Sequence, residues 1–178
     1  MIMKKEIQAF DYAGQICKAL PKGILMTTKN GDFVNTMVIG WGHIGIEWGR
    51  PIFVAYVRES RHTKQLLEEH GEFTVNIPTD NSHSKVLGYC GTKSGRDCDK
   101  IADMCLTLEA PNQISVPGIK EFPITLECRV IYKQKQNLDA IPSDILERFY
   151  PEEADGFRDC HIAYYGEIVD AYLIRDDM

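Results

Sequence analysis

A strict alternation between residues 124 and 132 constrains the fold of this chain more than any other feature of its sequence. Apolar side chains occupy every second position, and mostly polar side chains occupy the positions between them. A strand points successive side chains to opposite faces, so the pattern predicts one long, half-buried strand. The inner face would carry Ile124, Leu126, Cys128, Val130 and Tyr132, and the outer face Thr125, Glu127, Arg129 and Ile131.

Other β-prone segments surround this strand and predict a mainly β fold. Asn30 and Gly31 favour a hairpin turn between the first two segments, and Gly166 is typical of a bulge or a close approach within the last. Helices are expected at 60–70 and 143–149. Few helices and short turns indicate a small antiparallel β-barrel with peripheral helices. The further strands are expected at 24–28, 33–40, 51–57, 72–77 and 161–174.

Composition and charge narrow the class of protein. The chain has 178 residues, 44% of them hydrophobic, with no linker or repeat, so we expect a single domain over residues 1–178. Its formal net charge of −6 argues against a general binder of nucleic acid or anionic membranes. Because the sequence has neither a signal-peptide pattern nor a run of about 18 apolar residues, we expect a cytoplasmic protein.

The six cysteines and five histidines are scattered along the chain and favour no metal site. No C-x-x-C pair is present. In a chain without a secretion signal, such cysteines are expected to remain reduced thiols rather than to form a disulfide framework.

Residues 40–45, Gly-Trp-Gly-His-Ile-Gly, match the letters of a dinucleotide-binding fingerprint in the wrong context. The fingerprint needs a helix that begins inside the glycines, so that its N-terminal amides meet a pyrophosphate. Here Pro51 opens a new strand within a few residues. We therefore interpret the segment as a bent link between strands, where backbones approach closely.

Residues 58–64, Arg-Glu-Ser-Arg-His-Thr-Lys, gather three fixed positive charges where a strand ends and a helix begins. Unpaired amides and the helix dipole favour an anion there, and Ser60 and Thr63 can add hydroxyl donors. In the alternative interpretation, Ser60 only caps the helix, while Arg61 and Lys64 are solvated surface charges. The segment by itself leaves both interpretations open.

Residues 94–97, Ser-Gly-Arg-Asp, offer a second possible set of ligand contacts, because Gly95 allows close approach of the backbone. Taken alone, they fit a capped helix start at Asp97 better. His161, at the head of the last strand, is by the same standard more often a hydrogen-bonded structural histidine than a catalytic one. The sequence contains neither a P-loop nor an H-E-x-x-H motif.

In their order and spacing, these segments resemble the flavin reductase-like family, particularly its flavoredoxin branch. The resemblance covers about residues 18–174. The motifs that carry it are Asn35-Thr36-Met37 before Gly40-Trp41, Arg58-x-Ser60-x-x-Thr63, Gly71-Glu72-Phe73-Thr74-Val75-Asn76, Ser94-Gly95-Arg96-Asp97-x-Asp99-Lys100, and His161 with Gly166-Glu167.

The resemblance implies an FMN-binding split barrel of Greek-key type that forms a homodimer, with the flavin near the subunit boundary. It also implies a catalytic role for His161, close to the flavin ring, where it would position a nicotinamide. The implied cofactor-binding residues are Asn35, Thr36, Met37 and Trp41 along the ring, Arg58, Ser60 and Thr63 at the phosphate, and Ser94, Gly95 and Arg96 to complete the pocket.

The activity that we expect from the resemblance is that of an NAD(P)H-dependent flavin oxidoreductase. NADH or NADPH would reduce FMN, and electrons would pass to free flavin, ferric complexes or a protein acceptor. The flavin supplies the hydride chemistry, which agrees with the lack of a catalytic triad. One alternative is a flavoredoxin-type electron carrier without NAD(P)H turnover, whose acidic charge suits a basic redox partner. Another is a flavin-binding module without turnover.

Overall fold

The computed structural model describes residues 2–80 and 82–176, and strands dominate it. The strands are β1 (Ile2–Glu6), β2 (Ile24–Asn30), β3 (Phe33–Ile39), β4 (Gly42–Glu47), β5 (Arg50–Arg58), β6 (Glu72–Ile77), β7 (Leu108–Glu109), β8 (Gly118–Ile119), β9 (Ile124–Lys135) and β10 (His161–Asp176). The helices are η1 (Ala9–Tyr12), α1 (Ala13–Ala19), η2 (Leu20–Lys22), α2 (His62–His70), α3 (Ser84–Thr92), α4 (Lys100–Asp103), η3 (Leu138–Ala140) and α5 (Ser143–Phe149).

One antiparallel sheet organises the molecule. Its strand order is β3-β2-β6-β9-β10-β5-β4, with β1 paired to the C-terminal part of β10. The sheet curls until β3 approaches β5, although no ladder joins these two strands in the described part of the chain. The predicted mainly β class is confirmed, and the curled sheet is consistent with a split barrel.

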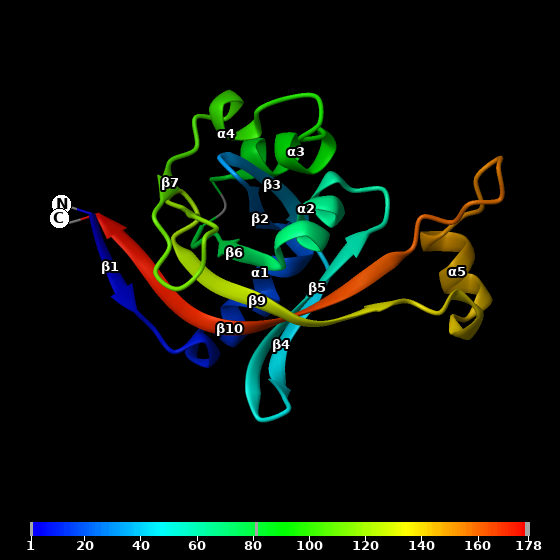
Figure 1. Ribbon diagram of the computed structural model, residues 1–178, viewed down its shortest axis with the longest axis horizontal. Coiled ribbons are helices and arrows are strands. Elements are labelled where there is room, and N and C mark those ends of the chain that lie inside the picture. Colours follow the sequence, from blue (N-terminus) through cyan, green and yellow to red (C-terminus); the bar gives the residue numbers. More distant parts are fainter. Residues whose placement is uncertain (1, 81, 177–178) are drawn as a thin grey trace.

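The long strands β9 and β10 run across the whole molecule, as Figure 1 shows. Helices α2, α3 and α4 lie on one side of them, and the β4–β5 hairpin projects on the other. At one end, β9 and β10 extend beyond the sheet and carry α5. We call residues 137–160, which connect these two strands, the arm.

The main core lies inside the curled sheet and explains why Gly166 is a glycine. Phe53, Phe73 and Leu126 are completely buried there. The register between β9 and β10 shifts between Tyr165 and Gly166, so the predicted bulge is confirmed. A Cβ on Gly166 would lie 2.5 Å from the Phe73 ring, a distance that only displacement of the core could relieve.

The strand expected to be half-buried is buried on both faces over its first five residues. Thr125 and Glu127 have no exposed surface, because the segment between α4 and β9 covers them. The Glu127 carboxylate accepts hydrogen bonds of 2.7 Å from the backbone N–H groups of Asn112 and Gln113. The prediction of a solvent-facing side was therefore wrong here, since a buried carboxylate is tolerated when backbone donors satisfy it.

The hairpin predicted around Gly31 is confirmed, whereas the link before Pro51 is itself a strand. β2 pairs with β3 from Ile24 to Asn30, and Gly31 has a positive φ of 57°. Strand β4 was missed because its glycines conceal the β pattern. A Cβ on Gly42 would lie 2.7 Å from the Val54 carbonyl oxygen, so the close approach of backbones is confirmed.

Two helix starts differ from the sequence interpretation. The N-cap of α2 is Arg61 rather than Ser60, and it caps without a side-chain hydrogen bond. The N-cap of α4 is Asp99 rather than Asp97, and its carboxylate accepts from two backbone amides of the first turn. The expected end of α2 at residue 70 is confirmed, since Gly71 follows as the C-cap with φ at 65°.

Candidate functional site

Two adjoining cavities lie along β3, on the side where β3 approaches β5 without pairing with it. The first, of about 160 Å³, is the basic cavity, and its charged lining residues are Arg61, Lys93, Arg96 and Lys100. The second, of about 220 Å³, is the aromatic cavity, lined by Trp41, Tyr56 and His161 together with Arg58. Met37, Val38 and Arg61 line both, so the two cavities are neighbours and together form the candidate site.

The structure brings most of the predicted binding residues to these cavities. Asn35, Met37, Ser60, Thr63, Ser94, Gly95 and Arg96 line the basic cavity. Met37, Trp41, Arg58 and His161 line the aromatic cavity. Thr36 differs, because its hydroxyl lies within the sheet, where it bonds to Thr27 Oγ1 and the Met26 carbonyl.

The basic cavity concentrates positive charge in an acidic protein. Four cationic side chains line it, and its lining contains no carboxylate among the described residues. The N-terminus of α2 also opens here, through His62 and Thr63. Uncapped amides and cations together favour a doubly charged anion such as a phosphate group.

Asn35, which lines the basic cavity, contains a buried acceptor without a partner. Its side chain is 3% exposed, and Nδ2 donates to Thr63 Oγ1 at 2.9 Å. Oδ1 is buried without a hydrogen-bond partner in the described chain, as is His62 Nδ1. Because buried polar atoms are rarely left unpaired, these two atoms indicate a place for a ligand with its own hydrogen-bonding groups.

Gly95 is required beside Asn35. A Cβ on Gly95 would overlap Asn35 Oδ1 and lie 2.9 Å from Asn35 Cγ. The 94–96 loop therefore lies directly against the Asn35 side chain, and only a glycine fits at this contact. This is the close approach expected from the sequence, with a side chain as its partner.

Lys100 is a buried cation whose ammonium group joins α4 to β3. It is 4% exposed, and Nζ donates to the carbonyl oxygens of Thr36 and Cys90, both at 2.9 Å. Burial lowers the pKa of the Lys100 ammonium from its usual value. The sequence analysis included Lys100 in the Ser94–Lys100 motif but did not place it among the binding residues.

Ser60 already holds an internal carboxylate. Its N–H donates to Asp159 Oδ1 at 3.0 Å, and its hydroxyl donates to Asp159 Oδ2 at 2.7 Å. Ser60 therefore does not cap α2, and its two donors form an anion-binding pair occupied by the arm. An external anion at Ser60 has to compete with Asp159.

Arg58 anchors the arm at two points, at its middle and close to its C-terminal end. Its guanidinium donates to the Asp159 carbonyl oxygen at 2.7 Å and to the Phe149 carbonyl oxygen at 3.0 Å, and it lies over the Tyr150 ring. It lines the aromatic cavity rather than the basic one. Its expected contact with a phosphate stays a prediction, and the cations of the basic cavity are better placed for that contact.

His161 lies among aromatic rings at the far end of the site. Its ring centroid is 4.8 Å from that of Trp41, and Tyr150 and Tyr56 also pack against it. Burial and then the charge of Arg58 lower the pKa of His161 to about 4. At neutral pH the imidazole is therefore uncharged.

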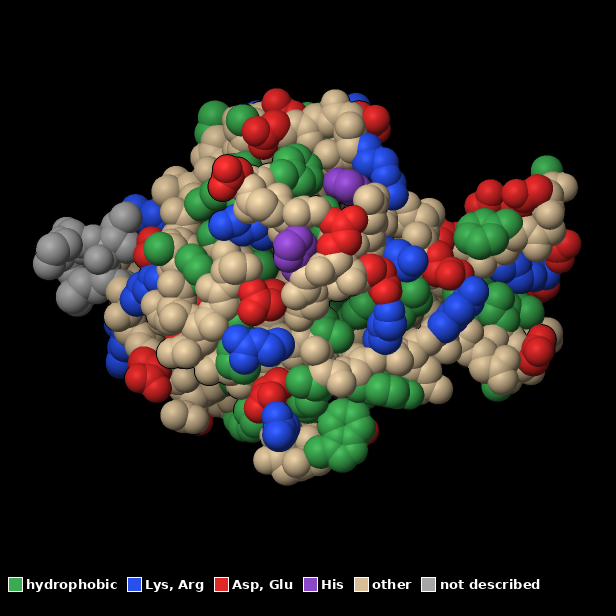
Figure 2. Space-filling model, in the orientation of Figure 1, with side chains coloured by type: hydrophobic (Ala, Val, Ile, Leu, Met, Phe, Trp, Pro, Cys, Tyr) green, Lys and Arg blue, Asp and Glu red, His purple; other side chains and the backbone are tan. Residues whose placement is uncertain are grey.

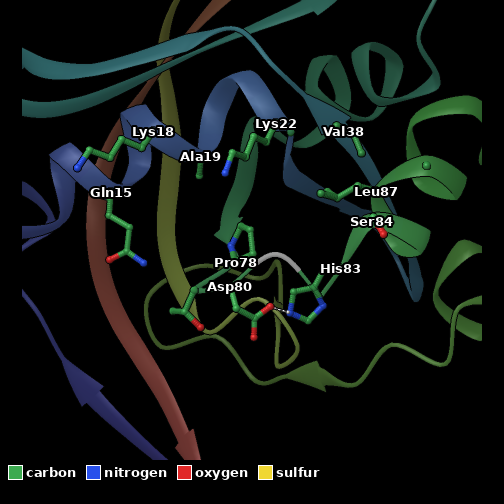
Figure 3. Close-up of a pocket in the computed structure, with 13 residues that line it drawn as sticks. Gln15, Lys18, Ala19, Lys22, Val38, Pro78, Asp80, His83, Ser84 and Leu87 are labelled. Atoms are coloured by element: carbon green, nitrogen blue, oxygen red, sulfur yellow. Dashed lines mark ion pairs between the residues drawn. The ribbon is translucent and has the colours of Figure 1, made fainter.

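A larger cavity of about 650 Å³ shares Val38 with the basic and aromatic cavities but contains none of the predicted site residues. Figure 3 shows Lys18 and Lys22 on one side of it and the ion pair between Asp80 and His83 on the other. Its basic side chains are exposed at an open surface, unlike Lys100. The two cavities along β3 are thus the better candidate site.

The whole arrangement defines the class of protein. The family model described as "Flavin reductase like domain" matches residues 19–178. The chain therefore belongs to the flavin reductase-like family, and the resemblance stated from its motifs is confirmed. Within the described residues, no helix is long and apolar enough to cross a membrane.

Two curated relatives carry no described activity. A protein of Archaeoglobus fulgidus is 34% identical over 97 residues, which are 54% of this chain and 54% of that protein. The chain thus matches about half the length of that relative. A protein of Pyrococcus abyssi is 30% identical over 133 residues, which are 73% of this chain and 74% of the relative.

Solved structures share the fold. Flavoredoxin of Desulfovibrio vulgaris has a TM-score of 0.64 and 23% identity, over 85% of this chain and 68% of its own. An FMN-binding domain of a flavin reductases-like enzyme from Shewanella baltica has a TM-score of 0.65 and 14% identity, over 96% of this chain and 77% of its own. The NADH:FAD oxidoreductase of Streptomyces globisporus has a TM-score of 0.61 and 14% identity, over 88% of this chain and 86% of its own.

Proposed function

We propose that the two neighbouring cavities along β3 bind FMN, with the phosphate in the basic cavity and the flavin ring toward the aromatic cavity. The observation that carries the proposal is one small cavity lined by four cations, with the unpartnered Asn35 Oδ1 buried beside it. FMN offers both a dianion and N–H and O–H donors, so it satisfies both features. The Shewanella baltica neighbour is itself described as FMN-binding.

Each group of residues has a defined part in this proposal. Arg61, Lys93 and Arg96 hold the phosphate, together with the hydroxyl of Thr63 and, once Asp159 has moved, that of Ser60. Asn35 and Met37 contact the flavin from β3, and the Ser94–Arg96 loop closes the cavity. Trp41 and His161 face the ring end and help to keep water from it.

We propose further that the protein is an NAD(P)H-dependent flavin oxidoreductase. Bound FMN would supply the hydride and electron chemistry. The neutral His161 and the rings of Trp41 and Tyr56 offer an aromatic surface suited to a planar nicotinamide, next to Arg58 and Arg61. The description of the Streptomyces globisporus neighbour as an NADH:FAD oxidoreductase supports this activity, with free flavin or ferric complexes as acceptors.

A flavoredoxin-type electron carrier is the second candidate, and the arm favours it. Residues 137–160 contain seven carboxylates and two arginines, so this segment carries most of the net negative charge. Figure 2 shows acidic and hydrophobic side chains together at that end of the molecule. Such a surface beside the aromatic cavity suits a basic protein acceptor.

Oxidation of NADH and NADPH by the FMN-loaded protein separates these two functions. A reductase should oxidise at least one of the nucleotides in steady state with excess free FMN as acceptor. His161→Ala should slow that step by roughly ten- to a hundred-fold if His161 positions the nicotinamide. Negligible oxidation of both nucleotides by a protein that holds FMN would favour the carrier and contradict the reductase.

A homodimer is part of the proposal, and exposed apolar side chains support it. Ile46 is 72% exposed and Trp48 60% exposed at the tip of the β4–β5 hairpin, and Tyr132 packs against Trp48. A second copy of the chain could cover this surface. Light scattering should report about twice the 20.2 kDa mass of one chain, and a monomer would contradict the homodimer.

Asp159→Asn is expected to tighten FMN binding. The substitution removes the negative charge that occupies both donors of Ser60, so a phosphate no longer competes with a carboxylate there. We expect roughly a three- to ten-fold lower dissociation constant for FMN and no change for riboflavin, which lacks the phosphate. Fluorescence titration measures both.

Asp155→Asn is the matched control, since Asp155 lies on the same arm and accepts only from the Phe157 amide among the described residues. It should leave FMN affinity unchanged. Equal effects of the two substitutions would show that general charge, rather than the Ser60 contact, governs the change.

A further inference from the structure

A buried hydrogen-bond chain fixes the protonation pattern of His161. The hydroxyl of Tyr150 lies 2.7 Å from Gln136 Oε1, to which it donates, and 2.8 Å from His161 Nδ1. A phenol carries one proton, so the hydroxyl that donates to Gln136 has to accept from Nδ1. Nδ1 therefore bears the ring hydrogen.

The other ring nitrogen is left with a lone pair. His161 is uncharged at neutral pH, because burial and Arg58 hold its pKa at about 4. A neutral imidazole with its hydrogen on Nδ1 has an acceptor at Nε2. No described residue forms a hydrogen bond with Nε2, and His161 lines the aromatic cavity.

The arm holds Tyr150 firmly in this position. Tyr150 is the C-cap of α5 and is 3% exposed, and its ring packs edge-on against His161 with centroids 5.6 Å apart. Arg58 binds the carbonyl oxygen of Phe149, directly before Tyr150, and that of Asp159, close to the end of the arm. Gln136 is fixed too, because its backbone N–H donates to the His161 carbonyl oxygen.

We propose that Tyr150 is a positioning residue that keeps His161 in the Nδ1–H tautomer, so that Nε2 offers a hydrogen-bond acceptor to the aromatic cavity. The ligand group opposite Nε2 is then a donor, an N–H or O–H, and not a carbonyl oxygen. The arm thus selects the chemistry of the ring end of the site. The ligand part of this inference rests on the proposed function, whereas the tautomer does not.

Nitrogen-15 NMR of the histidine rings in flavin-free protein tests the tautomer directly. In the unmodified protein, the two ring nitrogens of His161 should appear as a protonated Nδ1 and an unprotonated Nε2 at pH 7. Tyr150→Phe keeps the ring and removes the acceptor of Nδ1–H, so the hydrogen should move largely to Nε2, the tautomer that free histidine favours. A protonated Nε2 in the unmodified protein would overturn the proposal.

Gln136→Leu provides a second route to the same result with the phenol intact. Without Gln136 Oε1, the Tyr150 hydroxyl is free to donate to Nδ1, and the ring hydrogen should again move to Nε2. The Gln136 substitution leaves the Tyr150 hydroxyl in place, so a tautomer change shared by both variants cannot come from loss of that hydroxyl alone. An unchanged Nδ1–H tautomer in both variants would contradict the role of Tyr150.

Flavin titration then tests what the acceptor does. Tyr150→Phe and Gln136→Leu should each weaken the binding of FMN and of riboflavin by the same factor, roughly three- to ten-fold, because the lost contact is at the ring end, which both ligands share. A loss confined to FMN would contradict a ring-end contact. If the unmodified protein binds neither flavin, the proposed function fails, while the NMR result still decides the tautomer.

Discussion

Gly95→Ala is expected to weaken FMN binding by roughly ten- to a hundred-fold. The new Cβ would overlap Asn35 Oδ1, so either the 94–96 loop or the Asn35 side chain has to move. Overpacking of this kind costs about 1–3 kcal/mol. Movement of Asn35 would also break its 2.9 Å hydrogen bond to Thr63 Oγ1. Isothermal titration calorimetry with FMN measures the effect.

Gly91→Ala is the control for this prediction. Gly91 lines the same cavity from α3, but a Cβ there would meet Val38 at an ordinary contact distance of 3.5 Å. It should leave FMN affinity within a factor of about three. If Gly95→Ala binds FMN as the unmodified protein does, the flavin does not lie against the 94–96 loop.

Lys100→Met is expected to lower the free energy of unfolding by about 2–4 kcal/mol. Methionine keeps most of the side-chain length but donates no hydrogen bond, so the buried carbonyl oxygens of Thr36 and Cys90 both lose a donor. Each unsatisfied buried group costs about 1–3 kcal/mol. The loss of a cation should also weaken FMN binding. Urea denaturation of flavin-free protein isolates the first effect.

Lys93→Met separates charge from structure. Lys93 lines the same cavity with an exposed side chain, so its loss should change the free energy of unfolding by less than about 0.5 kcal/mol. Equal stabilities for the two variants would mean that the Lys100 ammonium is not a structural link between α4 and β3.

The sheet was largely predictable because most of its strands carry a local signal. Alternation, the Asn30-Gly31 turn and the glycine at 166 each depend on neighbouring residues. The burial of Glu127 was not predictable, because it depends on a loop whose backbone amides satisfy the carboxylate. Strand β4 was missed for a related reason, since its partner β5 rather than its own composition makes it a strand.

Most residues of the site could be predicted from the sequence, but the contacts between them could not. The motifs around Asn35, Ser60 and Gly95 converge on one cavity, as their shared resemblance implied. The contact between Ser60 and Asp159 joins residues 99 positions apart. The buried ammonium of Lys100 and the phenol of Tyr150 likewise act through tertiary contacts, so no spacing rule in one sequence identifies them.

The central claim is that the basic cavity holds the phosphate of a bound flavin. Parallel titrations of the unmodified protein with FMN and riboflavin test it most directly, because the two ligands differ only in the phosphate. Charge-assisted hydrogen bonds of about 1.5–3 kcal/mol predict that FMN binds at least ten-fold more tightly, and that Arg96→Ala narrows the difference. Equal affinity for FMN and riboflavin, or binding of neither, would contradict the claim.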